Sequence, residues 1–228
     1  NIISGADNAI IGGGSGNAIS GSPLAFVGGG SGNAIKSLPK GNSRGAAVVG
    51  GEKNIISGAT DAIIGGGSGN AISGVDGGFI GGGSGNFLIS STGTAATTAS
   101  GRGFWGAIVG GVRNELFSGA ASAIVGGEQN AVSGSDGAII GGGSGNAVSG
   151  APASVIMGGS GNAIIRSGQG VVAGAVIAGG IGNQIFSGDG GAMVGGEQNL
   201  ISGAPDAIIG GGSGNQIVSG GGGAIVGG

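Results

Sequence analysis

Carboxylates are the main side chains in this sequence that could do acid–base or metal chemistry. The chain has 228 residues, with ten Asp and Glu, seven Lys and Arg, and neither His nor Cys. Without His and Cys, the common combinations of nucleophile, base and metal ligand cannot be assembled. A glycosidase pair of carboxylates would also need sugar-binding aromatic residues in a cleft, and aromatic residues make up 3% of the chain. We therefore expect no enzyme activity, no cofactor and no catalytic or metal site.

The acidic residues recur along the sequence as single residues and do not form pairs. One group precedes the apolar segments of a repeat, and comprises Asp7, Asp61, Asp76, Asp136, Asp189 and Asp206. A second group follows those segments, and comprises Glu52, Glu128 and Glu197, while Glu115 directly follows an Asn. Such columns favour solubility over catalysis. The Gly-rich runs at 65–70 and 210–215 resemble calcium-binding repeats, but the liganding Asp is absent.

The elements that carry these residues are copies of one repeat, marked by a recurring Asn. The spacing is 16 residues, except 21 after Asn33 and Asn162 and 28 after Asn86, and an aliphatic residue follows each Asn by two positions. We predict that these residues stack as a structural column. Its members are Asn17, Asn33, Asn54, Asn70, Asn86, Asn114, Asn130, Asn146, Asn162, Asn183, Asn199 and Asn215, with Asn1 opening the series. Two interpretations remain open: a ladder of side-chain amides, or turn residues in the left-handed conformation.

Each repeat contains two short β-prone segments separated by Gly-rich corners. One segment has the form Asn-x-Ile-x, and the other is an apolar pair such as Ile63–Ile64, Val48–Val49 or Ile124–Val125, usually preceded by Ala. No Gly-free window has helical periodicity. The sequence therefore predicts an all-β fold, a parallel β-solenoid (β-roll) of about thirteen 16-residue coils with two strands each. Strand stacking at ~4.8 Å gives a rod of roughly 60 Å. Residues 1–228 are interpreted as one solenoid, an excerpt of a longer repeat region.

The apolar pair and the coil length lead to two further predictions. Adjacent strand residues point to opposite faces, so one member of each pair faces outward and creates an apolar stripe along the coils. Such a stripe favours packing against copies of the same chain, as a trimer or a filament; the alternative is a flattened coil that buries both residues. In the coil after Asn114 the first arc appears one residue longer and the Gly126–Gln129 corner one shorter. We interpret this as compensation that keeps sixteen residues per turn.

Three longer coils carry insertions at about 36–46, 89–106 and 165–174, all after Asn-x-aliphatic and before the apolar pair. They hold five of the seven basic residues and the only Trp, but none of the acidic residues. One interpretation is a set of contact loops for a partner, formed by Lys36, Lys40, Arg44, Arg102, Phe104, Trp105 and Arg166. The other is solvated loops whose aromatic residues cap a local hydrophobic gap.

Composition excludes several classes of protein. The net charge of −3 provides no field for binding nucleic acid, and no apolar run reaches the ~20 residues that span a bilayer. Collagen needs Gly at every third position and abundant Pro, whereas the chain has four Pro and no such period. A mean hydropathy of +0.41 differs from that of disordered chains.

The repeat resembles that of a known family. Residues 61–65 (Asp-Ala-Ile-Ile-Gly) and 68–74 (Ser-Gly-Asn-Ala-Ile-Ser-Gly) are similar to the head repeats of trimeric autotransporter adhesins of the YadA type. That resemblance implies a left-handed parallel β-roll, a trimer, an extracellular location at the cell surface, and binding to host or cell-surface proteins or glycans. The family repeat is commonly fourteen residues long, and no stalk or anchor is visible in this sequence.

These observations lead to three functional hypotheses. The first is a non-enzymatic structural or adhesive segment of an extracellular surface fibre. The second is a filament subunit that stacks end to end, and the third is a solenoid enzyme acting on polysaccharide.

Overall fold

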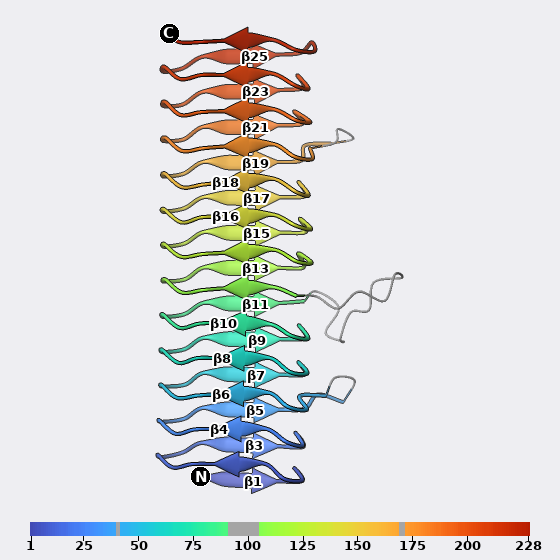
Figure 1. Cartoon of the computed structure of the whole chain (residues 1–228), viewed down its shortest axis with the longest axis vertical. Helices are drawn as coiled ribbons and strands as arrows, with labels where there is room; N and C mark the ends of the chain where they lie inside the picture. Colours follow the sequence, from blue (N-terminus) through green and yellow to red (C-terminus); the bar gives the residue numbers. More distant parts are fainter. Residues whose placement is uncertain (40–41, 91–104, 169–171) are drawn as a thin grey trace. The chain divides into compact units, whose positions relative to one another are not determined.

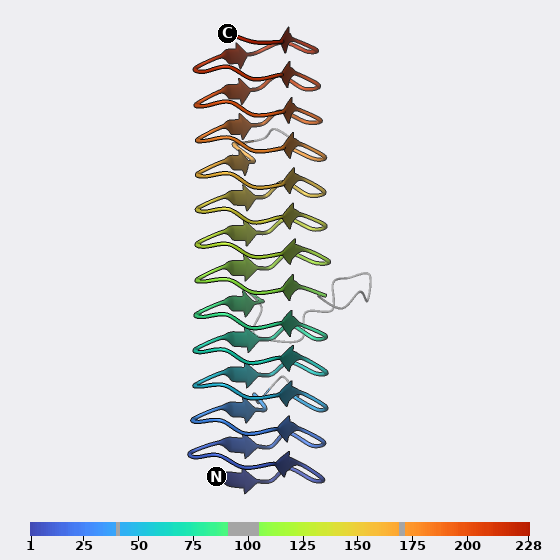
Figure 2. The same cartoon turned by 60° about the vertical axis from the view of Figure 1, so that its left-hand side comes forward.

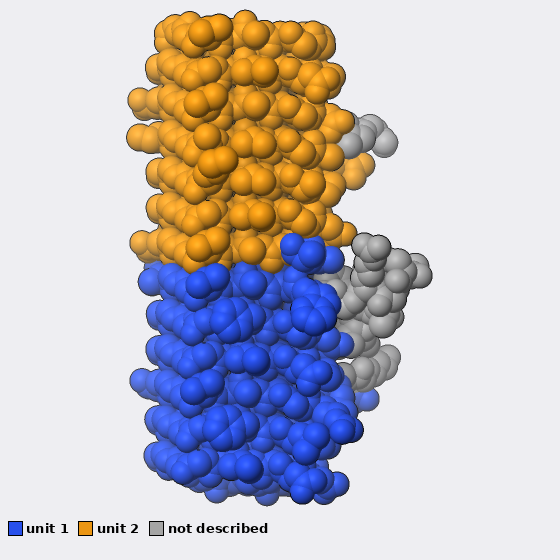
Figure 3. All heavy atoms as spheres, in the orientation of Figure 1, with its two compact units in different colours: residues 1–121 blue, residues 122–228 orange. Residues whose placement is uncertain are grey.

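Each repeat contains two short apolar segments. Neither segment can bury a face alone, so each pairs with the equivalent segment of the repeats on either side. The structure, a computed structural model, describes residues 1–39, 42–90, 105–168 and 172–228. These residues form strands, bends and turns and contain no helix, so none of them belongs to a membrane-spanning helix. The chain divides into two compact units, residues 1–121 and 122–228, coloured separately in Figure 3. About thirteen turns of roughly 16 residues make up the chain, and the predicted parallel β-solenoid is confirmed.

Unit 1 contains two sets of strands, seen as two columns in Figure 2. The odd-numbered strands form the first sheet: β1 (Ile2–Ser4), β3 (Ala18–Ser20), β5 (Ala34–Lys36), β7 (Ile55–Ser57), β9 (Ala71–Ser73), β11 (Phe87–Ile89) and β13 (Glu115–Phe117). The even-numbered strands form the second sheet: β2 (Ile10–Ile11), β4 (Phe26–Val27), β6 (Ala47–Val48), β8 (Ile63–Ile64), β10 (Phe79–Ile80) and β12 (Ala107–Ile108).

Unit 2 repeats this arrangement. Its first sheet contains β15 (Ala131–Ser133), β17 (Ala147–Ser149), β19 (Ala163–Ile165), β21 (Gln184–Phe186), β23 (Leu200–Ser202) and β25 (Gln216–Val218). Its second sheet contains β14 (Ala123–Ile124), β16 (Ile139–Ile140), β18 (Val155–Ile156), β20 (Val176–Ile177), β22 (Ala192–Met193), β24 (Ile208–Ile209) and β26 (Ala224–Ile225).

Each strand pairs in parallel with the equivalent strand of the next turn, so like residues stack on like residues. In unit 1, Ile56 of β7 is in register with Ile35 before it and Ile72 after it. Unit 2 shows the same order, for example Ile164 against Val148 and Ile185. Stacking at a constant register explains why the 16-residue period persists: a slip of one residue would turn every inward side chain outward.

The interior of each unit is a narrow core of aliphatic side chains from both sheets. The middle residue of each odd-numbered strand and the second residue of each even-numbered strand point inward, and Ile56, Ile64, Ile72 and Ile80 are fully buried. Small residues close the core at the corners, for example buried Ala62. β-Branched side chains suit these strands because they fit the pleated, tightly packed surface.

The strand register in the second sheet shows that the apolar pairs are not aligned as the sequence pattern predicts. Ala47 and Val48 are in register with Ile63 and Ile64, so Val49 follows the strand and aligns with Gly65. The predicted pair Val48–Val49 is therefore shifted by one residue from the pair Ile63–Ile64. The inward side chain selects the register, and buried Val48 stacks on buried Ile64.

The proposed compensation in the coil after Asn114 is wrong for the same reason. Ile124 pairs with Ile140, and Glu128 pairs with Ser144. Between these two fixed points both coils have the same number of residues, so the corner loses none. Val125 simply stands where the next coil has Gly141.

Candidate functional site

The recurring Asn forms a buried hydrogen-bonded column in each unit. In unit 1 the backbone N–H of each Asn donates to Oδ1 of the Asn one turn earlier, at 2.9–3.0 Å. In unit 2 the same bond is 2.9–3.1 Å long from Asn146 to Asn215. Every Asn from Asn17 to Asn199 in the series is buried. None of the column residues has a positive φ, so the left-handed turn interpretation does not describe them.

The Asn side chain also ties its own corner to the next turn. Asn70 Nδ2 donates to Gly66 O at 2.9 Å and to Gly83 O at 3.1 Å. A direct amide–amide bond is added at some positions, such as 3.2 Å from Asn70 Nδ2 to Asn54 Oδ1. The side chain thus replaces strand pairing at a corner where the backbone turns, and its role is structural.

The corner next to the Asn admits only Gly at one position of every coil. Gly67 has φ +85°, and a Cβ atom there would overlap Gly83 O and lie 2.8 Å from Asn70 Nδ2. The same geometry recurs at Gly83 and at Gly143. Gly is therefore required both by its positive φ and by the close approach of the next turn.

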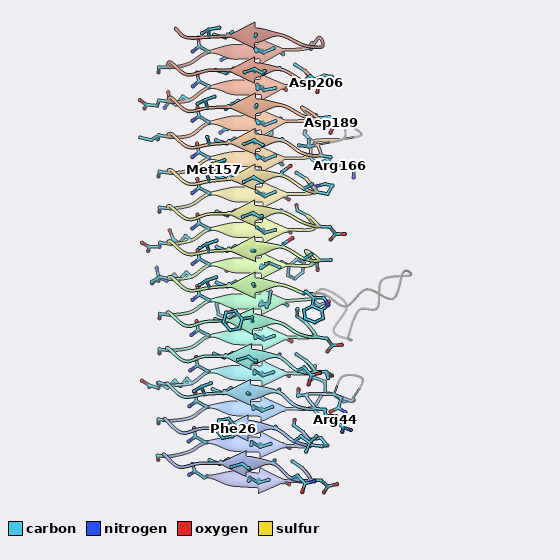
Figure 4. All side chains as sticks on the ribbon, in the orientation of Figure 1. Phe26, Arg44, Met157, Arg166, Asp189 and Asp206 are labelled. Atoms are coloured by element: carbon cyan, nitrogen blue, oxygen red, sulfur yellow. The ribbon has the colours of Figure 1, made fainter. Side chains whose placement is uncertain are left out.

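The described parts of the three insertions start and end at the same corner of their coils. In unit 1 the first lies between β5 and β6 and the second between β11 and β12, while in unit 2 the third lies between β19 and β20. Lys36, Arg44 and Trp105 are exposed in unit 1, as is Arg166 in unit 2. Lys40, Arg102 and Phe104 lie outside the described residues. Figure 4 shows Arg166, Asp189 and Asp206 on one side of unit 2.

Asp76 and Asp189, which belong to the predicted acidic column, accept backbone hydrogen bonds. Asp76 Oδ1 accepts from Thr60 N at 2.7 Å, and Asp189 Oδ1 accepts from Ala173 N at 2.9 Å. Each acceptor follows its donor by sixteen residues, so both join successive turns at the corner. These side chains, predicted only to favour solubility, therefore also hold the backbone of the preceding turn.

At the opposite corner, Lys53 Nζ donates to Glu52 Oε1 at 2.8 Å, and both side chains are exposed. The hydrogen bond and the positive charge of Lys53 lower the pKa of Glu52.

The outer face of the second sheet, named here the apolar face, exposes apolar side chains in both units. Its first outward position is the first residue of each even-numbered strand, and its second outward position is the residue after that strand. Ile63 is 41% exposed whereas the adjacent Ile64 is fully buried, which agrees with the predicted outward stripe and not with a coil that buries both. The two positions hold only Ile, Val, Phe, Met, Ala and Gly in all thirteen coils. Phe26 and Met157 in Figure 4 belong to this face.

The outer face of the first sheet has a different composition. Its outward positions include Lys36, Glu115, Gln184 and Gln216, together with many Ser residues. Polar side chains interrupt any apolar stripe there. The two faces of the same solenoid therefore differ in a way that solubility alone does not require.

A pocket of about 420 Å³ borders the apolar face in unit 1. Its lining includes Ile63, Phe79, Trp105 and Asp61. The Trp105 ring lies over Gly77, where a Cβ atom would be 3.3 Å from Trp105 Cε3. Trp105 thus contacts a Gly corner, while Phe104, the other residue predicted to cap a hydrophobic gap, lies outside the described residues.

The fold defines the class of protein, a parallel β-solenoid built from a Gly-rich, Asn-marked repeat. The sequence matches no protein-family model, and no curated protein sequence shows significant similarity to it.

Proposed function

We propose that this chain is a non-enzymatic structural segment of an extracellular surface fibre, and that it packs against copies of itself through the apolar face. The observation that carries the proposal is the absence of any polar side chain from both outward positions of the second sheet. Soluble monomers rarely expose a contiguous apolar patch of more than a few hundred Å². The surface location and the adhesive role are supported by the resemblance of the repeat to YadA-type adhesin heads.

The area of the apolar face suits an interface. Burying a whole aliphatic side chain is worth about 1.5–3 kcal/mol at about 25 cal/mol per Å², so a half-exposed one offers about 50 Å². The six coils of unit 1 then offer about 300 Å² and the seven coils of unit 2 about 350 Å² per copy, before flanking residues are counted. Together these two areas are close to the roughly 800 Å² per partner of a standard interface. A second copy supplies a surface of matching size and character.

The test compares matched residues on the two faces of the same coils. Ile63 and Phe79 on the apolar face are 41% and 40% exposed, while Ile55 and Phe87 on the first sheet are 39% and 37% exposed. We expect the wild-type protein to be oligomeric by sedimentation equilibrium. The double substitution Ile63→Glu with Phe79→Glu should dissociate it, and Ile55→Glu with Phe87→Glu should not. A monomeric wild type, or equal dissociation by both variants, would reject self-packing through this face.

The adhesive part of the proposal rests on the exposed residues of the insertions, namely Lys36, Arg44, Trp105 and Arg166. Alanine substitution of all four should abolish binding to host or cell-surface proteins and glycans in an array assay, while the oligomeric state is unchanged. Binding that is unaltered in this variant would reject the role of these four residues, and a wild type that binds nothing on the array would leave a purely structural fibre or an end-to-end filament. Antibody labelling of intact cells that express the full gene tests the surface location.

A further inference from the structure

The two outward positions of the apolar face are occupied reciprocally. In one kind of coil, named here type 1, the first position holds Ile or Phe and the second holds Gly. In the other kind, type 2, the first holds Ala and the second holds Val. Strands β2, β4, β8, β10, β16 and β24 are type 1, and β6, β12, β14, β22 and β26 are type 2. The remaining two, β18 and β20, carry Val at the first position, followed by Met157 and Ala178 respectively.

In a type 1 coil the second outward position holds Gly, which leaves a hollow beside the large side chain, and the backbone of the next turn leaves no room for a Cβ atom there. A Cβ atom on Gly65 would overlap Gly81 O of the next turn, and one on Gly210 would lie 2.8 Å from Val226 O. The backbone of these two type 1 coils therefore requires Gly at the second outward position. A type 2 coil accepts Val at that place and has its hollow over Ala.

Each type thus presents one exposed apolar knob beside one hollow. In type 1 the knob is a residue such as Ile63, and in type 2 it is a residue such as Val49, which is 55% exposed. Contact with water does not require that each of these coils have one large outward side chain, at the first position in type 1 and at the second position in type 2. A surface that must fit another surface would keep this relief.

We infer that each unit packs with its apolar face against the apolar face of the same unit in a second copy, parallel and in register, around a twofold axis that runs along the stacking direction of that unit. This inference rests on the proposed self-packing and specifies its geometry. Such an axis places the first outward position of each coil opposite the second position of the same coil in the partner. In the eleven coils of types 1 and 2 every knob then meets the hollow of its own coil, while Val155 meets Met157 in the β18 coil and Val176 meets Ala178 in the β20 coil. An antiparallel pairing would need type 1 opposite type 2 throughout, and it would place like positions opposite each other.

A second large outward side chain in one coil tests whether knobs of one copy contact hollows of the other. Ala47→Ile gives the β6 coil two knobs and no hollow, whereas Ala47→Ile with Val49→Gly converts it to type 1. We expect the single variant to weaken association about tenfold and the double variant to restore it. If association depended only on the apolar area buried, and not on shape, the single variant should associate more tightly, because Ala47→Ile adds apolar area. Tighter association of the single variant overturns the inference. Unfolding midpoints of both variants, measured by circular dichroism, show whether either is misfolded.

Crosslinking provides a second test that needs no bulky substitution, since the chain has no Cys. A copy with Ala47→Cys, coexpressed with a size-tagged copy carrying Val49→Cys, should be joined by a short bismaleimide, because packed sheets lie about 10 Å apart. The matched control pairs Ala47→Cys with Val109→Cys, three turns along the same column, which adds about 14 Å. Equal crosslinking in both pairs overturns the register but leaves self-packing intact. A wild-type protein that is monomeric overturns both proposals.

Discussion

Removal of one column Asn tests whether the buried hydrogen bonds hold the solenoid together. Asn70 is fully buried, and its Oδ1 accepts from Asn86 N at 2.9 Å. Asn70→Ala removes this acceptor from the backbone N–H of Asn86, which is itself fully buried. The two carbonyls fare differently: Gly83 O keeps its bond from Ser68 N at 3.0 Å, while Gly66 O loses the bond from Asn70.

The expected loss follows from this inventory. A buried polar group without a partner costs about 1–3 kcal/mol, and the unpaired N–H together with the partly exposed Gly66 O gives about 3 kcal/mol. Urea unfolding followed by circular dichroism measures the change, with linear extrapolation to water. Amide exchange at Asn86 reports the same bond locally and should become much faster in the variant.

The matched control is Asn8→Ala, because Asn8 is exposed at a corner with φ +56°. We expect a loss of less than about 1 kcal/mol there. If Asn70→Ala costs no more than Asn8→Ala and leaves exchange at Asn86 unchanged, the column contributes nothing and the reasoning is refuted.

Three further outcomes are expected. Gly83→Ala should lower the free energy of unfolding by about 3 kcal/mol or more, because φ is +86° and the new Cβ would overlap Gly111 O; Gly82→Ala, with open space around it, should be neutral or stabilise by less than about 1 kcal/mol. Ile64→Ala should cost about 2–5 kcal/mol as a core truncation, whereas Ile63→Ala, compared by urea unfolding under conditions that keep the chain monomeric, should cost less than about 1 kcal/mol. Lys53→Ala should raise the pKa of Glu52 toward its ordinary value in an NMR titration, because Lys53 is the group that lowers it. In the wild type this pair stabilises the fold at pH values above the ordinary carboxyl pKa, and the effect is lost as the pH falls through the lowered pKa of Glu52. An unchanged Glu52 titration, equal losses at residues 63 and 64, or equal losses at residues 82 and 83 would each contradict the corresponding argument.

The repeat, its period and the number of coils could be predicted from the amino-acid sequence. A 16-residue spacing of Asn, aliphatic and Gly residues can be read without any three-dimensional information, and it predicts parallel stacking of like on like. The aliphatic residue two positions after each Asn can also be read from the sequence, and the structure shows that it points inward, for example at buried Ile56 and Ile72.

Tertiary structure alone decided which member of each apolar pair points inward. Ile63–Ile64 and Val48–Val49 look equivalent as letters, but the neighbouring turn places Val48 with Ile64 and leaves Val49 outside. The partners of the Asn side chains were hidden for the same reason, because Gly66 O and Gly83 O come from two different turns. Local pattern gives the period of a solenoid, whereas the register between turns is fixed by contacts sixteen or more residues apart. That register also revealed the reciprocal knobs and hollows, from which the proposed pairing follows.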